Sequence, residues 1–380
     1  MTPSRALVHV LADCDAATLD CVARLQERAS GWGWQQRVVC LEPTLVERVR
    51  RRLGYPVRVA ACRFGCTGLG AVSLRRCVAD LDVRLMLAWG AQAAATCRAS
   101  RPDVALGVVL HDLAPADRLS GWVRSVAGER VALVAPSQLV RQRLIEAGAD
   151  PRQCRLIRPP VDFGRLGSVD AGRVAAELAL PGGAPVLLMS GPPSRTGGHR
   201  YGAWAAALLQ QRWADLRVIV PGSSSEQRRL RRFAEGIGLA DMTVFTGDRY
   251  DWPELLAVAD VLLVPATGDV DTTPLAWAMA GAVPVVGTAI PAVEELIVAG
   301  RTGLLAEPRV LPSLTSMVMY AIDEQAVRNR IVEQARSLAF ELFSGAGFDA
   351  AYHGLFEELA ARRPPLSQAQ QLAASGQAVG

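Results

Sequence analysis

The sequence predicts an α/β protein with two doubly wound domains, each built on a parallel β-sheet. Short apolar segments typical of buried strands alternate with longer helical segments along almost all of the 380 residues. The strand segments are apolar throughout, which is typical of parallel sheets that helices cover on both faces. They form two series that separate near RPPVDFGRLG, 158–167, where Pro159 and Pro160 interrupt regular structure.

The strand segments define the expected domains. The first series is 6–12, 36–41, 56–61, 83–88, 104–110, 130–135 and 154–158, and the second is 184–190, 216–221, 242–246, 260–265, 283–286 and 303–306. We expect an N-terminal domain at 1–163 and a C-terminal domain at 164–345. Residues 346–362 are expected to form a helix that packs on a domain surface through its apolar face: Phe348, Tyr352, Leu355, Phe356 and Leu359. The small, polar residues 363–380 are expected to be disordered.

Composition argues against several classes of function. The formal net charge is +4, an excess too mild to indicate nucleic-acid binding, and every basic residue is an arginine. The eight cysteines are irregularly spaced, and Cys62 with Cys66 lacks the second pair of a zinc site. We interpret them as small buried residues of a cytoplasmic protein. The apolar run 276–293 contains Pro284 and Pro291, so no membrane span is expected.

A glycine-rich loop follows the first strand of the second domain. GPPSRTGGHRYGAWAAALL, 191–209, begins at Gly191 and leads into a helix, with Arg195 in the loop and Arg200 at the helix start. Strand, glycine-rich loop and helix is the usual arrangement for binding a phosphate, and a flexible turn with solvated arginines is the alternative. Ligands of doubly wound domains bind beyond the carboxyl ends of the strands, so the cleft between the domains is the expected site.

A second loop, GDVDTTPLAWAMAGAVPVV at 268–286, follows a later strand of the same domain. Thr273 followed by Pro274 predicts a helix start, with the threonine hydroxyl as N-cap and the end of the helix at Gly281. Free amides at such a start suit a diphosphate. The amides concerned are those of Thr272, Thr273 and Leu275.

Acidic and imidazole side chains accompany these loops. Asp269 and Asp271 stand before the helix start, where they either cap its amides or accept hydrogen bonds from sugar hydroxyls. In the first domain VVLHDL, 108–113, places His111 at the carboxyl end of a strand. An imidazole there can donate or accept a proton near neutral pH, and a histidine tucked under a loop is the alternative.

The other histidines and the arginine runs are interpreted as structural. His9 lies inside the first strand and is expected in the core, whereas His199 and His353 are expected at the periphery. The runs are Arg50, Arg51 and Arg52, and Arg228, Arg229, Arg231 and Arg232. Both are expected to be solvated helix faces, with contact to anionic lipid headgroups as the alternative.

The order of these segments resembles that of the group 1 (family 4) nucleotide-sugar glycosyltransferases. VALVAPSQLVRQRLIEAGADPRQCRLIRPPVD, 131–162, is similar to the end of that family's first domain. AMAGAVPVV and VEELIVAGRTGLLAEP are similar to its Glu-Ala-Met-Ala, Pro-Val-Val, Glu and Gly-x-x-Gly run. The resemblance covers nearly the whole chain and implies the GT-B fold, in which two Rossmann-like domains face a cleft.

The resemblance also assigns roles to individual residues. Asp269 matches the first of two glutamates in the family's donor site, and Trp277 replaces the second, which holds the nucleotide ribose. Glu295 matches a later glutamate, and His111 matches a histidine of the donor-sugar pocket.

Some of the family's residues have no counterpart here. The arginine and lysine that neutralise the diphosphate fall on Pro192 and Gly197, so Arg195 or Arg200 would supply that charge. The glycine pair expected after the first strand is replaced by ADCDAATLDC, 12–21.

The resemblance implies a bacterial glycosyltransferase of polysaccharide biosynthesis. It would move a hexose-like sugar, with retention, from a nucleoside diphosphate sugar to a saccharide or lipid-linked acceptor of the cell-envelope glycan or glycolipid type. His111, Arg195 and Asp269 would be catalytic. The donor would be bound by Gly191, Arg200, Thr272, Thr273, Leu275, Trp277 and Glu295.

The implied enzyme would use no cofactor or metal beyond its nucleotide-sugar co-substrate. It would be cytoplasmic, with peripheral contact at the inner face of the membrane. The substituted positions leave open a catalytically inactive GT-B protein that acts as a binding or regulatory subunit. Another two-domain α/β enzyme, such as a GT-B-like sugar epimerase, is the third alternative.

Overall fold

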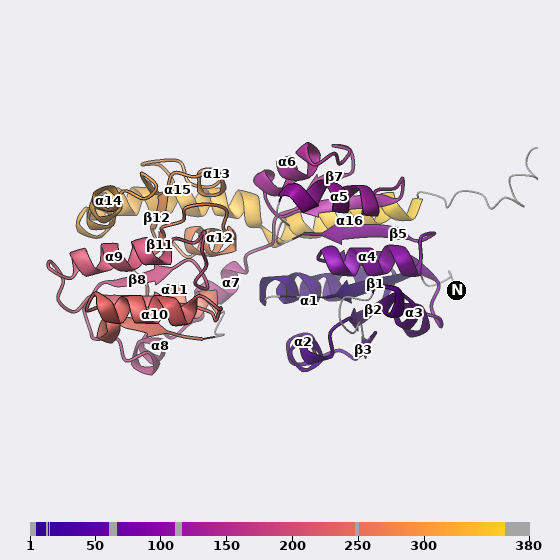
Figure 1. The fold of residues 1–380 in the computed structure, drawn as a ribbon, viewed down its shortest axis with the longest axis horizontal. Helices are drawn as coiled ribbons and strands as arrows, with labels where there is room; N and C mark the ends of the chain where they lie inside the picture. The colour runs from indigo at the N-terminus through magenta and orange to yellow at the C-terminus, as the bar shows by residue number, and fades with distance from the viewer. Residues whose placement is uncertain are drawn as a thin grey trace, which may run out of the picture. The chain divides into compact units, whose positions relative to one another are not determined.

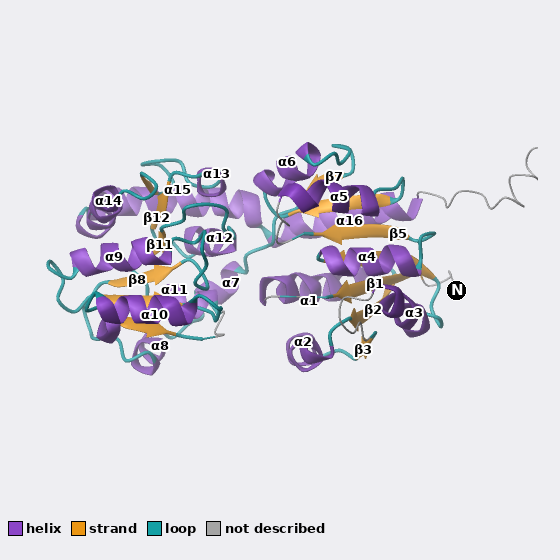
Figure 2. Cartoon of the chain, viewed as in Figure 1, coloured by secondary structure: helices purple, strands orange, loops and turns teal. Residues whose placement is uncertain are grey.

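The computed structural model describes residues 5–12, 14, 16–60, 67–110, 116–247 and 251–361 (Figure 1). The chain divides into two compact units. The first comprises Met1–Arg158 and Phe348–Gly380, and the second comprises Pro159–Gly347. The division falls at the proline pair that interrupts the two strand series, a few residues before the expected boundary at 163. Each unit is a sheet flanked by helices, as the sequence predicts (Figure 2).

The first unit contains seven parallel strands in the order β3-β2-β1-β4-β5-β6-β7. Each strand overlaps a segment predicted from the sequence. The strands are β1 (Arg5–Leu11), β2 (Trp34–Cys40), β3 (Val57–Val59), β4 (Val83–Trp89), β5 (Ala105–Val109), β6 (Val131–Ala135) and β7 (Cys154–Leu156). The order reverses between β1 and β4, which makes the sheet doubly wound.

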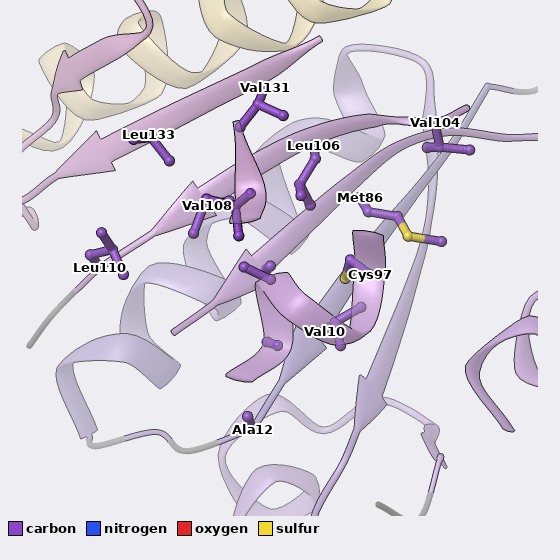
Figure 3. Packing of buried hydrophobic residues seen from close by; sticks show 14 of the residues in the cluster. Val10, Ala12, Met86, Cys97, Val104, Leu106, Val108, Leu110, Val131 and Leu133 are labelled. Atoms are coloured by element: carbon purple, nitrogen blue, oxygen red, sulfur yellow. The ribbon is translucent and has the colours of Figure 1, made fainter. Parts of the chain in front are cut away.

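Helices cover both faces of this sheet. Successive strand residues point to opposite faces, so the apolar side chains of each strand are divided between two buried clusters. In β1, Val8 and Val10 belong to one buried cluster, whereas Leu7 and Leu11 belong to the other. The first cluster, part of which Figure 3 shows, packs under α3 (Thr67–Cys77), α4 (Ala91–Ser100), α5 (Ala116–Val126) and α6 (Gln138–Glu146). The second packs under α1 (Ala16–Gly31), α2 (Val46–Leu53, which follows the short helix η1, Pro43–Leu45) and α16 (Gly345–Ala361). Burial on both faces explains why the strands are apolar throughout.

The second unit contains six parallel strands in the order β10-β9-β8-β11-β12-β13. They are β8 (Val186–Met189), β9 (Arg217–Val220), β10 (Thr243–Phe245), β11 (Val261–Val264), β12 (Val285–Thr288) and β13 (Leu304–Ala306). Its helices are α7 (Phe163–Leu166), α8 (Ala171–Glu177), α9 (His199–Leu209), α10 (Gln227–Gly236), η3 (Ala240–Met242), α11 (Trp252–Leu256), α12 (Thr273–Ala280), α13 (Pro291–Glu294), α14 (Leu311–Asp323) and α15 (Gln325–Phe343). Here the strand order reverses between β8 and β11.

The last helix, α16, packs on the first unit although it follows the second in the sequence (yellow in Figure 1). The five apolar side chains predicted to face a domain surface are all buried. Ion pairs fasten the polar side of the helix: Arg24 Nε lies 2.7 Å from Asp349 Oδ1, and Arg155 Nη2 lies 2.7 Å from Glu358 Oε1. The segment 363–380, which we expect to be disordered, lies outside the described residues.

The cysteines in the described residues are free thiols, and most are buried, as predicted. Cys14, Cys21, Cys40, Cys97 and Cys154 are buried, and Cys77 is half-buried. Burial raises the pKa of the Cys40 thiol to about 12. Cys62 and Cys66 lie outside the described residues. In the part of the chain that the structure describes, no helix is both long and apolar enough to cross a membrane.

His9 is a fully buried histidine of β1, and both of its ring nitrogens are hydrogen-bonded. Trp89 Nε1 donates to His9 Nδ1 at 3.3 Å. The ring proton is therefore on Nε2, which donates to Gln36 Oε1 at 3.2 Å. Because burial disfavours the charged imidazolium, the pKa of His9 is lowered from 6.5 to about 4. The predicted core histidine is confirmed.

We predict that the first unit loses stability as the pH falls from about 6.5 to about 4. In that range the unfolded state protonates His9, whereas the folded state keeps it neutral until the lowered pKa is reached. His9 alone then reduces the free energy of unfolding by about 3 kcal/mol at about pH 4. Urea unfolding across this range measures the loss, with His9→Gln as the comparison. An equal acid-dependent loss in His9→Gln would exclude His9 as its source.

Candidate functional site

Two loops of the second unit lie at the carboxyl edge of its sheet. The glycine-rich loop 190–198 joins β8 to α9, and the loop 265–272 joins β11 to α12. β8 and β11 are hydrogen-bonded neighbours, with Leu188 opposite Leu262. Because the strand order reverses between these two strands, the loops stand at the position where doubly wound sheets bind ligands.

Two hydrogen bonds and one close backbone contact join the two loops. The amide of Thr267 donates to the carbonyl of Thr196 at 2.7 Å, and the Thr267 hydroxyl donates to the same oxygen at 3.4 Å. Gly198 has a φ of +66°, and a Cβ at this residue would lie only 1.7 Å from the carbonyl oxygen of Pro265. Both the backbone conformation and the lack of space therefore require glycine here.

His199, the first residue of α9, is buried rather than peripheral, so that expectation was wrong. Its side chain is 4% exposed, and Nε2 lies 2.9 Å from the carbonyl oxygen of Gly191, at the other end of the loop. Burial lowers the pKa of this imidazole below its ordinary value. Helical spacing could have predicted the burial, because His199 shares a face with Gly202, Ala203 and Ala206, which are also buried.

The start of α12 differs from the prediction. Thr273 is the first helical residue, Thr272 occupies the N-cap position, and neither hydroxyl caps the helix. Instead Asp271 Oδ1 accepts a hydrogen bond from the amide of Thr273 at 2.9 Å. The predicted threonine cap was therefore wrong, and Asp271 caps the helix. Pro274, predicted as the first helical residue, is the second, and Gly281 follows the last helical residue as predicted.

The body of α12 belongs to the core, whereas its start faces outward. Leu275 is fully buried and Trp277 is 6% exposed, as part of an uninterrupted buried run from 274 to 280. By contrast Asp269 and Asp271 are exposed in the loop before the helix. The helix therefore offers a ligand its first residue, Thr273, and the preceding loop, while the Trp277 side chain packs inside.

The two candidate arginines, Arg195 in the glycine-rich loop and Arg200 in the first turn of α9, differ in how they are held. The Arg195 side chain is 83% exposed, and its Nε lies 3.8 Å from Glu226 Oε1. The Arg200 guanidinium lies over the ring of Phe233 on α10, at 4.5 Å from the ring centre. Arg195 is therefore the more loosely held positive charge on this loop.

The remaining candidates are distributed over the same sheet edge. Gly191, with a φ of +139°, begins the loop after β8. Glu295 is half-buried at the end of α13, the helix that follows β12. Gly191, Asp269 and Glu295 thus lie after β8, β11 and β12 respectively, three strands that are neighbours in the sheet. His111 lies outside the described residues.

The sequence of this region matches a known family. Residues 184–323 match the family model described as Glycosyl transferases group 1. The second unit carries a group 1 glycosyltransferase domain. D-inositol 3-phosphate glycosyltransferase 1 of Catenulispora acidiphila is 28% identical over 240 residues, 58% of this chain and 57% of that protein. Alpha-D-kanosaminyltransferase of Streptomyces kanamyceticus is 23% identical over 177 residues, 46% of each. The chain spans about half the length of the curated relatives it matches.

Solved structures match over nearly the whole chain. A structure of HepE from Anabaena in complex with UDP and glucose has a TM-score of 0.80 at 18% identity, over 93% of this chain and 99% of that chain. Sucrose-phosphate synthase from Thermosynechococcus elongatus has a TM-score of 0.77 at 15% identity, over 94% and 99%. At these identities the likeness establishes the fold. The chain has the GT-B fold of two parallel-sheet, Rossmann-like domains.

One departure of this glycosyltransferase domain from the family pattern has a steric basis. A Cβ at Gly197, where the resemblance places a lysine, would lie 2.7 Å from Ser194 Oγ and 2.8 Å from the ring of His199. A longer side chain therefore requires both neighbours to move, and the loop is built around a glycine at this position.

We predict that Gly198→Ala destabilises the glycosyltransferase domain by about 3 kcal/mol, through strain at positive φ and the collision with Pro265. Chemical denaturation measures the change. Gly236→Ala is the matched control, because Gly236 ends α10 with nothing within 4 Å of its Cβ position and no positive φ. We expect that control to change stability by less than about 1 kcal/mol. Equal stability of the two variants would refute the close approach at Gly198.

Proposed function

We propose that this protein is a glycosyltransferase that moves a hexose-like sugar from a nucleoside diphosphate sugar to an acceptor, with retention. The observation that carries the proposal is the joining of the β8 and β11 loops within a group 1 glycosyltransferase domain. A structure of HepE from Anabaena in complex with UDP-glucose, at a TM-score of 0.78 and 19% identity, supports the choice of donor class. The inactive alternative is not favoured, because the matching relatives bear the names of transferases and a synthase.

In the proposed reaction the bond between the sugar C1 and the diphosphate oxygen breaks. C1 bonds to the acceptor oxygen on the same face of the sugar, and the acceptor proton passes to the departing diphosphate. The first turns of α9 and α12 present positive dipole ends and backbone amides to the diphosphate, except for the amide of Thr273, which donates to Asp271. Arg195 adds a mobile positive charge, so the leaving group is stabilised electrostatically and the mechanism needs no metal ion.

The sugar and ribose are the proposed ligands of the acidic residues. Asp269, exposed in the β11 loop, accepts hydrogen bonds from sugar hydroxyls, and Glu295 accepts them from the β12 side. Trp277 packs in the core, so the ribose is held without the glutamate usual at that position. His111 of the first domain is proposed to support the sugar.

We also propose a setting for this activity. The acceptor is a saccharide or a lipid-linked saccharide of the cell-envelope glycan or glycolipid type, and nucleic acid is not a partner. The enzyme works in the cytoplasm with peripheral contact to the inner face of the membrane. Exposed arginines on α10 support that contact: Arg228, Arg229, Arg231 and Arg232.

We predict that Arg195→Ala lowers turnover about 100-fold, because it removes one charge that stabilises the diphosphate leaving group. The assay is release of nucleoside diphosphate from UDP-, GDP- and ADP-glucose, together with calorimetric binding of each. Arg330→Ala, on the exposed side of α15, is the matched control and should leave turnover unchanged. Normal turnover in Arg195→Ala would remove Arg195 from the mechanism. Failure of all three donors to bind the wild-type protein would contradict the proposed function itself.

A further inference from the structure

His199 is a buried polar group whose two ring nitrogens are used unequally. A carbonyl oxygen only accepts hydrogen bonds, so the contact with Gly191 places the ring proton on Nε2. Nδ1 is then a lone-pair acceptor, and it is buried without a hydrogen-bond partner among the described residues. Such groups are uncommon in folded proteins and call for a physical explanation.

The hydroxyl of Ser194 and this lone pair both lie close to the backbone of Gly197. The point where a Cβ of residue 197 would stand is 2.7 Å from Ser194 Oγ and 2.8 Å from His199 Nδ1. The two polar atoms therefore face the same small space above Gly197. Ser194 Oγ accepts a hydrogen bond from the amide of Gly197 at 2.9 Å. In this bond the hydroxyl oxygen is the acceptor, so the hydroxyl proton is not used.

We propose that Ser194 donates its hydroxyl proton to His199 Nδ1 when the glycine-rich loop closes on a diphosphate. The inference rests on the proposed function, because it names what the donor loop does when that ligand binds. A small approach of Ser194 to the ring satisfies the buried acceptor, and it draws the loop toward the first turn of α9. His199 is then a positioning residue, held to the start of the loop through Nε2 and to its middle through Nδ1.

The same geometry accounts for the glycine at position 197. A Cβ there would stand within 2.8 Å of both Ser194 Oγ and His199 Nδ1, too close for both to stay where they are. A lysine at 197 would therefore displace at least one of the two groups that form the proposed hydrogen bond. In this loop the hydrogen bond between Ser194 and His199 orders the backbone at the position where the family has a lysine. The exposed Arg195 supplies the positive charge.

A double-mutant cycle tests this coupling. Calorimetry measures the affinities for UDP, GDP and ADP of the wild type, Ser194→Ala, His199→Gln and the double variant. Glutamine keeps an N–H for the Gly191 carbonyl but has no acceptor at the place of Nδ1. We expect Ser194→Ala to weaken binding about tenfold in the wild-type background and less than about twofold in the His199→Gln background.

Two controls keep the result interpretable. His353→Gln, at the exposed His353 of α16, is the matched background, and there Ser194→Ala should keep its full tenfold effect. Gly197→Ala is an independent variant: it should weaken nucleotide binding to the same extent as Ser194→Ala, and adding Ser194→Ala to it should cause no further loss. Thermal unfolding of each variant shows whether the domain remains folded.

The outcomes separate this inference from the proposed function. An equal penalty for Ser194→Ala in the wild-type and His199→Gln backgrounds overturns the inference, because the two side chains would then act independently. So does unchanged binding in both Ser194→Ala and Gly197→Ala. If the folded wild-type protein binds none of the three nucleotides, the proposed function fails first, and the inference fails with it.

Discussion

The contact between Gly198 and the carbonyl of Pro265 is the constraint on which the arrangement of the two site loops depends. No side chain larger than hydrogen fits between them, so the start of α9 lies directly against the loop that follows β11. The hydrogen bond from Thr267 to Thr196 adds a second fastening beside it. As a result the glycine-rich loop and the loop that carries Asp269 form one structural element. The neighbouring strands β8 and β11 hold the two loops in place.

Two buried histidines show how differently the same side chain can be used. His9 has a partner for each nitrogen, so burial costs it little and it contributes to a rigid core. His199 has a partner for Nε2 alone, and its free acceptor faces the loop proposed to bind the diphosphate. An unsatisfied acceptor is tolerated where it can gain a partner in another state of the protein. That difference distinguishes a structural imidazole from one placed to respond to a ligand.

The departures from the family pattern form a consistent set. Gly197 stands where a lysine is expected, and a lysine there would require Ser194 and His199 to move. Trp277 stands where a ribose-binding glutamate is expected, and it is part of the core. Arg195 stays exposed beside Glu226 and is the positive charge proposed to stabilise the diphosphate. These substitutions shift the proposed donor site from charged side chains toward backbone amides and one mobile arginine.

The strands, their two series and the position of both site loops were predictable from the sequence, because burial of a parallel strand on both faces leaves an apolar run in a few consecutive residues. The apolar stripe of α16 was predictable for the same local reason. The cap of α12 was not, because the choice between the Thr273 hydroxyl and the Asp271 carboxylate depends on backbone angles that neighbouring segments impose. The need for glycine at 198 depends on Pro265, which belongs to a different loop. The sequence alone thus determined which helices and strands form and which loops can bind a ligand. The tertiary structure decided which atoms of those loops are in contact, because contacts between distant segments exist only once the sheet has brought its loops together.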